Sequence, residues 1–250
     1  MNHFLMQDIG IRYAKNRPYF HPLVIERVQA QIALTSPQDI RGLDVACGTG
    51  QSTKALAPLS ENIVAMETAY SMLSAAPRDA ASYVQAGADQ FPFVDNAFHL
   101  LSVALAFHCF DRQKFLTEAA RVLKPSGWLL IYNNVFLGRM KEHVGFIDWV
   151  ESVYLNQYPT PARNRSPFTV AEAQTFGFRW YHEDRFCNEV RFTASELVAY
   201  LITQTNILQA LASDEIEKDI RTWLRAEVDQ YFTEPSGQFV FEAHMGLLQR

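Results

Sequence analysis

Short apolar runs bounded by turn residues recur through the first half of the chain. They lie at Leu43–Ala46, Ile63–Met66, Tyr83–Ala86, Leu100–Leu105 and Trp128–Tyr132. Apolar runs of this length, without polar alternation, are typical of strands that are buried on both faces. The segments between them carry helical patterns, and strands that alternate with helices form parallel βαβ units with right-handed crossovers. The pattern therefore predicts an open α/β sheet.

One helix in this region is marked at both ends. Asp111 is a suitable N-cap residue, and the turn-forming segment Lys124-Pro-Ser-Gly127 follows. Between them, apolar side chains recur at helical spacing, at Phe115, Leu116, Ala119, Val122 and Leu123. We therefore expect a helix that begins after Asp111, buries one face, and stops at the 124–127 turn.

After Asn134 the pattern becomes mainly helical. Val144–Tyr154 has helical spacing, and Thr169-x-x-Glu172 and Thr193-x-x-Glu196 are capping-box signatures. Two amphipathic helices are predicted, with apolar stripes at Leu197, Tyr200, Leu201, Leu208 and Leu211 and at Ile216, Ile220, Trp223, Leu224 and Tyr231. Phe178–Phe192 and Gln238–Leu248 have the composition of strands. They would add two strands to the sheet, with helices inserted between them as a cap.

Composition and charge narrow the possible functions. The chain has 250 residues, of which 48% are hydrophobic and 20% charged, as in ordinary globular proteins. Its net charge of −5 has the wrong sign for a protein that holds nucleic acid by counterion release. The three cysteines, Cys47, Cys109 and Cys187, form no CxxC pair, so neither a disulfide framework nor a metal site is predicted. Neither a leader nor a membrane span is recognisable, and we expect a cytoplasmic protein without a membrane partner.

The segment with the clearest chemistry is Gly42-Leu-Asp-Val-Ala-Cys-Gly-Thr-Gly50. It places an apolar strand before two glycines and a helix-like stretch, an arrangement that lets a ligand approach the backbone closely. Thr53 stands where the dinucleotide fingerprint has a third glycine. The next apolar strand ends at Glu67, where a carboxylate can accept hydrogen bonds from ribose hydroxyls. Asp44 either contacts the ligand or holds the loop N–H groups.

These motifs resemble the class I S-adenosylmethionine-dependent methyltransferases, in particular the type 11 group of ubiquinone-biosynthesis and trans-aconitate methyltransferase-like proteins. The resemblance rests on five ordered segments: Leu43–Gly50, the acid at Glu67, Ala88-Asp-Gln-Phe-Pro-Phe93, Ala106-Phe-His-Cys-Phe-Asp111 and Arg121-Val-Leu-Lys-Pro-Ser-Gly127. Tyr13-x-x-x-Arg17-Pro-Tyr19 is similar to an entry segment of the same group, and Thr203–Asn206 to a polar patch of its cap. The resemblance implies a doubly wound, seven-stranded Rossmann-like sheet with an inserted helical cap.

The resemblance also implies the residues of a cofactor site. The glycine turn would hold the methionyl part of S-adenosylmethionine, Glu67 the ribose, and Ala88 and Asp89 the adenine. The full set of implied cofactor residues is Tyr13, Arg17, Asp44, Ala46, Gly48, Gly50, Glu67, Thr68, Met72, Ala88, Asp89, Ala106 and Phe107. The implied acceptor-binding residues are Tyr19, His21, Asn133, Tyr200 and Gln204.

His108 is the candidate catalytic residue, because an acceptor hydroxyl or protonated amine needs a base nearby. The alternative is a histidine that orients its loop or bonds the cofactor. Three positions depart from the family pattern: His99 and Gly87 stand where aspartate is usual, and Cys109 replaces a tryptophan. The first departure removes a charge at the start of a strand, the second shifts adenine recognition onto Asp89, and the third changes the volume of the acceptor site.

The expected organisation follows from these assignments. Residues 1–36 would form an N-terminal lid and first helix, 37–134 the S-adenosylmethionine-binding core, 135–176 and 194–234 the helical cap, and 177–193 and 237–250 the last two strands. The aromatic residues Trp149, Tyr154, Trp180 and Tyr200 either line an apolar acceptor cavity or form the core of the cap. The predicted function is methyl transfer to the oxygen, nitrogen or carbon atom of a small molecule. The alternatives are a non-catalytic protein that binds S-adenosylmethionine and a nicotinamide-dependent oxidoreductase.

Overall fold

The computed structural model describes residues 9–32, 36–162, 166–211 and 214–250. The chain forms two compact units. We call residues 19–134, 163–185 and 243–250 the sheet unit, and residues 1–18, 135–162 and 186–242 the helical unit. Each unit is described by itself.

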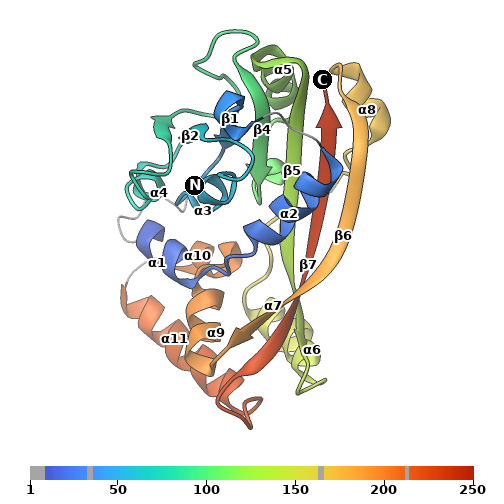
Figure 1. The fold of residues 1–250 in the computed structure, drawn as a ribbon. Coiled ribbons are helices and arrows are strands. Elements are labelled where there is room, and N and C mark those ends of the chain that lie inside the picture. Colours follow the sequence, from blue (N-terminus) through green and yellow to red (C-terminus); the bar gives the residue numbers. More distant parts are fainter. Residues whose placement is uncertain (1–8, 33–35, 163–165, 212–213) are drawn as a thin grey trace. The chain divides into compact units, whose positions relative to one another are not determined.

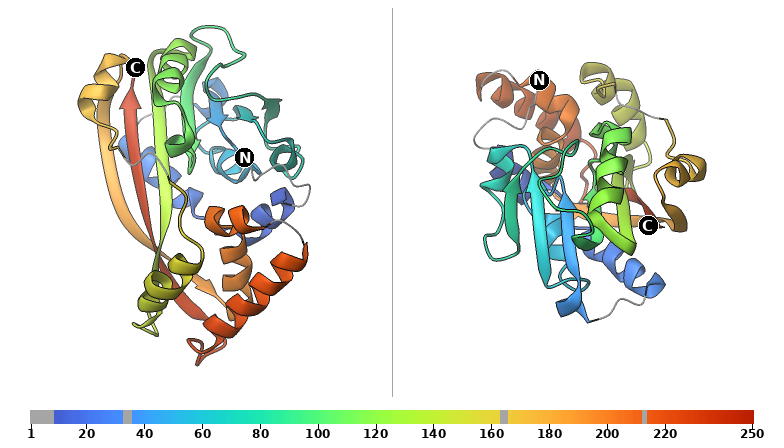
Figure 2. Two further views of the ribbon diagram at one scale, coloured as in Figure 1. Left: turned by 180° about the vertical axis from the view of Figure 1, so that it is seen from behind. Right: turned by 90° about the horizontal axis from the view of Figure 1, so that it is seen from above.

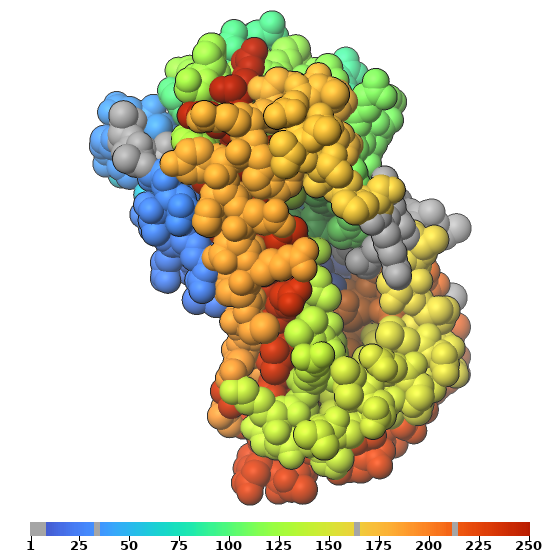
Figure 3. Space-filling view, turned by 90° about the vertical axis from the view of Figure 1, so that its right-hand side faces the viewer, coloured from blue at the N-terminus to red at the C-terminus, as the bar shows by residue number. Residues whose placement is uncertain are grey.

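Seven strands form one sheet in the order β3-β2-β1-β4-β5-β7-β6 (Figure 1). Their bounds are β1 (Arg41–Val45), β2 (Asn62–Glu67), β3 (Ser82–Gln85), β4 (Phe98–Ala104), β5 (Leu123–Met140), β6 (Arg179–Phe192) and β7 (Gly237–Gln249). The first five are parallel to their neighbours. β7 runs the other way, because the backbone of Arg250 bonds Ser126 and Gly127 whereas Gln238 bonds Lys141. The sheet is therefore mixed, and its edge strand β6 lies at the surface drawn in Figure 3.

Helices cover both faces of the sheet unit. They are α2 (His21–Gln31), η2 (Pro37–Asp39), α3 (Gln51–Ala55), α4 (Tyr70–Leu73), η3 (Phe107–Cys109), α5 (Arg112–Val122) and α8 (Val170–Thr175). Leu43 and Val45 share a core cluster with Phe115 of α5. Side chains alternate along a strand, so Asp44 points to the other face, where His21 of α2 bonds Tyr132 of β5.

The N-terminal ends of three helices confirm the predicted caps. The side chain of Asp111 accepts a hydrogen bond from the Lys114 N–H at the start of α5. Thr169 caps α8 in the same way. Thr193 and Glu196 form a reciprocal capping box at the start of α9 (Ala194–Ile202). Each cap satisfies N–H groups that a helix leaves without an internal partner.

The helical unit is built around an aromatic core. Its helices are α1 (Ile9–Asn16), α6 (Phe146–Trp149), the π-helical turn η4 (Val150–Tyr154), α7 (Leu155–Gln157), α9, α10 (Thr205–Ala210) and α11 (Asp214–Asp229). α9 packs against α11 and α1 (Figure 2). Phe146, Trp149, Tyr200, Phe239 and Phe241 are buried together in this core.

Two predicted elements were wrong in extent. β5 begins at Leu123 and includes residues 124–127, which the sequence predicts as a turn, and it continues beyond Tyr132 to Met140. Bonds with Arg250 hold this first part extended, although Ser126 has a φ of 65°. The helix predicted through Leu197 and Leu211 is instead two helices, α9 and α10. The N–H and hydroxyl of Thr203 both bond the Tyr200 carbonyl and end α9.

No helix among the residues that the structure describes is long and apolar enough to span a membrane.

Candidate functional site

A sharp turn follows β1 and carries the first group of candidate residues. Ala46, Gly48 and Gly50 have φ values of 55°, 56° and 78°, a left-handed conformation that favours glycine. A Cβ atom at Gly50 would lie 2.9 Å from the Tyr83 hydroxyl and 3.1 Å from Pro77. Gly50 is therefore required both by its backbone conformation and by the lack of space around it.

Asp44, in β1 just before the turn, forms hydrogen bonds to residues that follow the turn. Its side chain is fully buried, and its Oδ2 accepts hydrogen bonds from the hydroxyls of Ser52 and Thr53, both at 2.7 Å. Burial raises the pKa of Asp44 to about 6, and the two hydroxyls oppose that rise. Thr53, which replaces the third glycine of the dinucleotide fingerprint, thus fixes the carboxylate. The sequence presented it only as a departure.

Glu67 is fixed at the end of β2 by backbone N–H groups. Its Oε1 accepts from Thr68 at 2.8 Å and from Ala69 at 2.9 Å, and its Oε2 accepts from Gly48 at 3.2 Å. The glycine turn and the acid are therefore one hydrogen-bonded unit. The buried Met72 closes the same turn, since its Cε would lie 3.3 Å from a Cβ at Gly48.

The loop after β3 carries Ala88 and Asp89. A Cβ at Gly87 would lie 2.8 Å from Oδ1 of Asp89, so the Asp89 carboxylate occupies the space beside this glycine. The loop is held by a pair on α5 that sequence reasoning missed. Arg121 donates to the carbonyls of Phe91 and Phe93 at 3.1 and 2.7 Å. Glu118 accepts from the Phe91 N–H at 2.6 Å and also pairs with Arg121.

The turn after β4 presents Ala106, Phe107 and His108. It begins at Leu105, whose φ of 60° redirects the chain, and continues as η3. The Phe107 ring lies 5.6 Å from the ring of Phe115 and 5.2 Å from that of Phe168, so it packs within the sheet unit. His108 is half-buried. Its role as a base stays a prediction.

His21 and Tyr132 form a buried pair beside this region. Nδ1 of His21 lies 2.9 Å from the Tyr132 hydroxyl, and both side chains are almost fully buried. Burial lowers the pKa of His21 to about 3, so the imidazole is neutral. Tyr19 is exposed with its ring 5.8 Å from that of His21. The Asn133 side chain accepts the Asn134 N–H at 2.9 Å.

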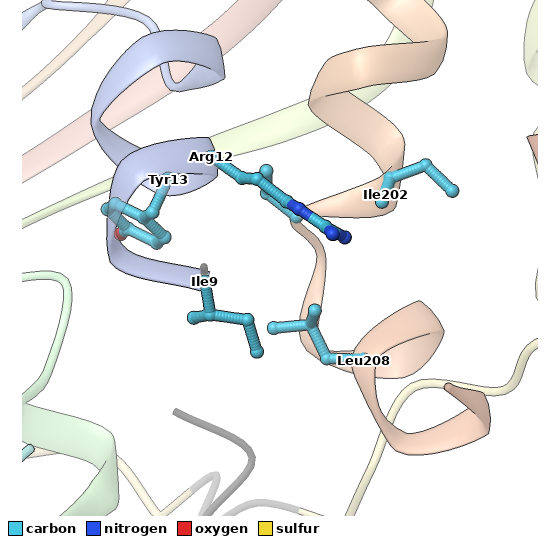
Figure 4. A pocket seen from close by; sticks show the side chains of 6 residues that line it. Ile9, Arg12, Tyr13, Ile202 and Leu208 are labelled. Atoms are coloured by element: carbon cyan, nitrogen blue, oxygen red, sulfur yellow. The ribbon is translucent and has the colours of Figure 1, made fainter. Parts of the chain in front are cut away.

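Four predicted residues lie in the helical unit and come together there. The guanidinium of Arg17 lies over the rings of Tyr13 and Tyr200, at 4.7 and 5.4 Å, and Tyr200 bonds the side chain of Gln204. A small pocket adjoins them, lined by Ile9, Arg12, Tyr13, Ile202, Thr203 and Leu208. Figure 4 shows Arg12 and Tyr13 projecting from α1, with Ile202 and Leu208 on α9 and α10.

The structure thus brings the predicted residues together in two sets, one in each unit. In the sheet unit, Gly48, Glu67, Thr68 and Met72 surround the glycine turn. Three polar atoms around this turn are buried without a partner among the described residues: Asp44 Oδ1, Thr49 Oγ1 and Tyr83 OH. Buried polar atoms are normally hydrogen-bonded, so this turn has unused capacity for a polar ligand.

The exposed fractions of the four aromatic side chains decide whether they line an acceptor cavity or form a core. Trp149, Tyr154 and Tyr200 are at most 3% exposed and belong to the aromatic core of the helical unit. Trp180 packs against the core of the sheet unit instead. These side chains therefore form core packing. Within the described ranges, no group of three His, Cys, Asp or Glu side chains is arranged to hold a metal ion.

Five parallel strands, a glycine turn after β1 and an acid at the end of β2 are typical of Rossmann-like folds that bind nucleotide-containing cofactors. Residues 43–131 match the family model of the methyltransferase domain of the type 11 group. This part of the chain is therefore similar to a methyltransferase domain.

Two relatives are similar in sequence to part of this chain. A demethylmenaquinone methyltransferase of Clavibacter sepedonicus is 33% identical over 111 residues, which cover 42% of this chain and 45% of the relative. A malonyl-[acyl-carrier protein] O-methyltransferase of Buchnera aphidicola is 30% identical over 125 residues, covering 48% of this chain and 50% of the relative. The chain spans about half the length of these relatives.

The similarity of fold extends further than that of sequence. A structure from Anaeromyxobacter dehalogenans, provisionally classed as a type II methyltransferase, superposes with a TM-score of 0.64 at 18% identity. The superposition covers 91% of this chain and 94% of that one. The seven-stranded fold predicted from the sequence is thereby confirmed.

Proposed function

We propose that the protein transfers a methyl group from S-adenosylmethionine to a small-molecule acceptor. The observation that carries the proposal is the hydrogen-bonded unit of the glycine turn and Glu67. Its carboxylate is held by three N–H groups. Two of them donate to Oε1 and one to Oε2, so Oε2 keeps a second lone pair for a ribose hydroxyl. The relatives with named acceptors methylate different kinds of molecule. The proposal therefore names only a small-molecule acceptor.

The polar groups around the glycine turn can bind the polar groups of S-adenosylmethionine. Thr49 Oγ1 and Tyr83 OH are buried beside the glycine turn without partners in the described chain, and both can bond polar groups of a ligand. Ala88 and Asp89 stand on the loop held by Arg121, which supports the predicted adenine contact. When bound, S-adenosylmethionine supplies an electrophilic methyl group on a sulfonium.

The chain's own residues would position the acceptor and exclude water. Phe107 packs in the turn after β4, and its ring face can stabilise a neighbouring cation by about 0.5 to 2 kcal/mol. His108, on the same turn, is the proposed base for acceptors that must lose a proton. The family match favours methyl transfer over the oxidoreductase alternative. None of the three cysteines forms a disulfide in the described chain, which fits the proposed cytoplasmic setting.

Calorimetric titration with S-adenosylhomocysteine tests the proposal without the unknown acceptor. We expect one-to-one binding, weakened in Glu67→Gln by about 1–3 kcal/mol through lost hydrogen bonds to a charged group. Glu61→Gln is the matched control, because Glu61 is exposed just before the opposite end of β2. Absence of binding to the folded wild-type protein would overturn the proposal. Equal effects of the two substitutions would remove Glu67 from the cofactor site.

A further inference from the structure

The helix that follows the glycine turn is too short to hold its own position. α3 has five residues, Gln51–Ala55, and it follows Gly50, which has no side chain to cap it. Isolated helices shorter than about 12 residues are marginal in water, because the first hydrogen-bonded turn is costly to form. The position of α3, and with it the conformation of the glycine turn, is therefore set by bonds to the rest of the sheet unit.

Three consecutive side chains of α3 are bonded from outside the helix. The hydroxyls of Ser52 and Thr53 donate to Asp44 in β1, both at 2.7 Å. The side chain of Gln51 bonds His21, the first residue of α2. Successive residues of an α-helix project about 100° apart, so these side chains hold α3 from different directions. Strand β1 provides one attachment, and helix α2 provides the other.

The imidazole of His21 is also bonded to Tyr132. Nδ1 of His21 lies 2.9 Å from the Tyr132 hydroxyl, and the two side chains are 3% and 2% exposed. The bond to Gln51 opposes the fall that burial causes in the pKa of His21, as a ring N–H that donates to an amide carbonyl does. A neutral imidazole has one donor and one acceptor nitrogen. Nε2–H therefore donates to Gln51, and the Tyr132 O–H donates to Nδ1.

We propose that His21 is a positioning residue for the glycine turn and that it acts by orienting Gln51. The inference rests on the proposed methyltransferase function. Both ring nitrogens of His21 are used within the sheet unit, so this role replaces the acceptor contact that the resemblance implies. His21 also precedes the segment 43–131 that matches the family model. Helix α2 thus contributes to the cofactor site although it lies outside the matched segment.

Two substitutions separate the two bonds of His21. The polar end of an asparagine side chain lies near the place of Nδ1, and that of a glutamine lies near the place of Nε2. His21→Asn therefore keeps a partner for Tyr132 and loses the bond to Gln51, whereas His21→Gln does the reverse. Both variants place a smaller polar side chain in the same buried position, so both should lower the free energy of unfolding. Glu26→Gln is the control, because Glu26 is an exposed residue of α2.

Calorimetric titration of the full chain with S-adenosylhomocysteine measures the effect on the glycine turn. His21→Asn should weaken binding at least about fivefold, because Gln51 loses a buried hydrogen-bond partner. His21→Gln should change the dissociation constant less than about twofold, because the bond to Gln51 is kept. Glu26→Gln should leave it unchanged. In ¹⁵N spectra of the wild-type imidazole, the proton of His21 should lie on Nε2.

Two results would overturn the inference. One is an affinity of His21→Asn that equals or exceeds that of His21→Gln, because a merely structural role would affect both variants alike. The other is a wild-type proton on Nδ1, since Nε2 could then not donate to Gln51. Failure of the proposed function is a distinguishable outcome, because S-adenosylhomocysteine would then not bind the folded wild-type protein at all.

Discussion

The two units hold a buried charged group in different ways. In the sheet unit, Asp44 is bonded by two hydroxyls from the helix that follows the glycine turn. In the helical unit, Arg17 is held by one carbonyl and two aromatic faces. Each arrangement leaves one buried atom without a hydrogen-bond partner among the described residues, Oδ1 of Asp44 and Nε of Arg17. The difference lies in the neighbours: hydroxyl groups hold Asp44, whereas aromatic rings and one carbonyl hold Arg17.

The largest expected effect tests whether the aromatic core stabilises the helical unit. Phe146 is fully buried, with its ring 5.2 Å from those of Trp149, Tyr231 and Phe239. Phe146→Ala should lower the free energy of unfolding by about 3–5 kcal/mol, through lost burial and a cavity. Val144→Ala is the control, because Val144 is 89% exposed. Similar denaturation midpoints for the two variants would show that this core carries little stability.

The second prediction concerns the two titrating groups of the sheet unit. The pKa of His21 is lowered from 6.5 to about 3, so its contribution to stability is present above pH 6.5 and is lost as the pH falls toward 3. The pKa of Asp44 is raised from 3.8 to about 6, so its contribution is present below pH 3.8 and is lost as the pH rises through 6. The two dependences oppose each other between pH 4 and 6.

Single substitutions should separate the pH dependences of His21 and Asp44. His21→Gln should remove the acid-side loss, a slope of at most about 1.4 kcal/mol per pH unit for one group. Asp44→Asn should make the acid-side loss steeper, because the opposing group is gone. Urea denaturation from pH 4 to 7 measures both slopes. A His21→Gln profile parallel to that of the wild type would contradict a buried neutral imidazole.

Two glycines with a left-handed backbone, Gly50 and Gly177, differ in the space around them. Gly50 and Gly177 have similar φ values, 78° and 82°, but only Gly50 is crowded, and a Cβ at Gly177 would meet no atom within 4 Å. Gly177→Ala should cost about 1–2 kcal/mol of stability from backbone strain alone, without changing cofactor affinity. Gly50→Ala should cost more and weaken S-adenosylhomocysteine binding at least about tenfold. Equal affinities in calorimetry would separate this turn from cofactor binding.

Strands β1, β2 and β4 could be predicted from the sequence because they are mostly buried on both faces and appear as continuous apolar runs. The extension of β5 could not, since residues 133–140 include two asparagines and Gly138, and the strand there depends on tertiary pairing. The break between α9 and α10 was missed for a local reason. The hydroxyl of Thr203 competes for the Tyr200 carbonyl, and apolar spacing contains no sign of it.

Some features of the candidate site could be predicted from the sequence, and others could not. The glycine turn and Glu67 are recognisable because they are adjacent in sequence to predicted strand ends. The pair of His21 and Tyr132 joins positions 111 residues apart, and neither residue alone indicates the other. The unpaired state of Arg17 also depends on which acidic residues lie near it in three dimensions. Such contacts follow from packing, which one sequence without an alignment does not specify.

The smallest expected effect concerns the pair on α5 that holds the 86–93 loop. Glu118 accepts the Phe91 N–H and fixes Arg121, and Arg121 also contacts Asp95, which is 68% exposed at its side chain. Glu118→Gln should weaken binding of both S-adenosylhomocysteine and 5′-methylthioadenosine by about 1–2 kcal/mol, because an accepting carboxylate is lost. Asp95→Asn should change either affinity by less than about 0.5 kcal/mol, since exposed ion pairs contribute little. Because the two ligands share the adenosine part, a loss confined to S-adenosylhomocysteine would place the effect at its amino-acid end and separate the α5 pair from adenine recognition.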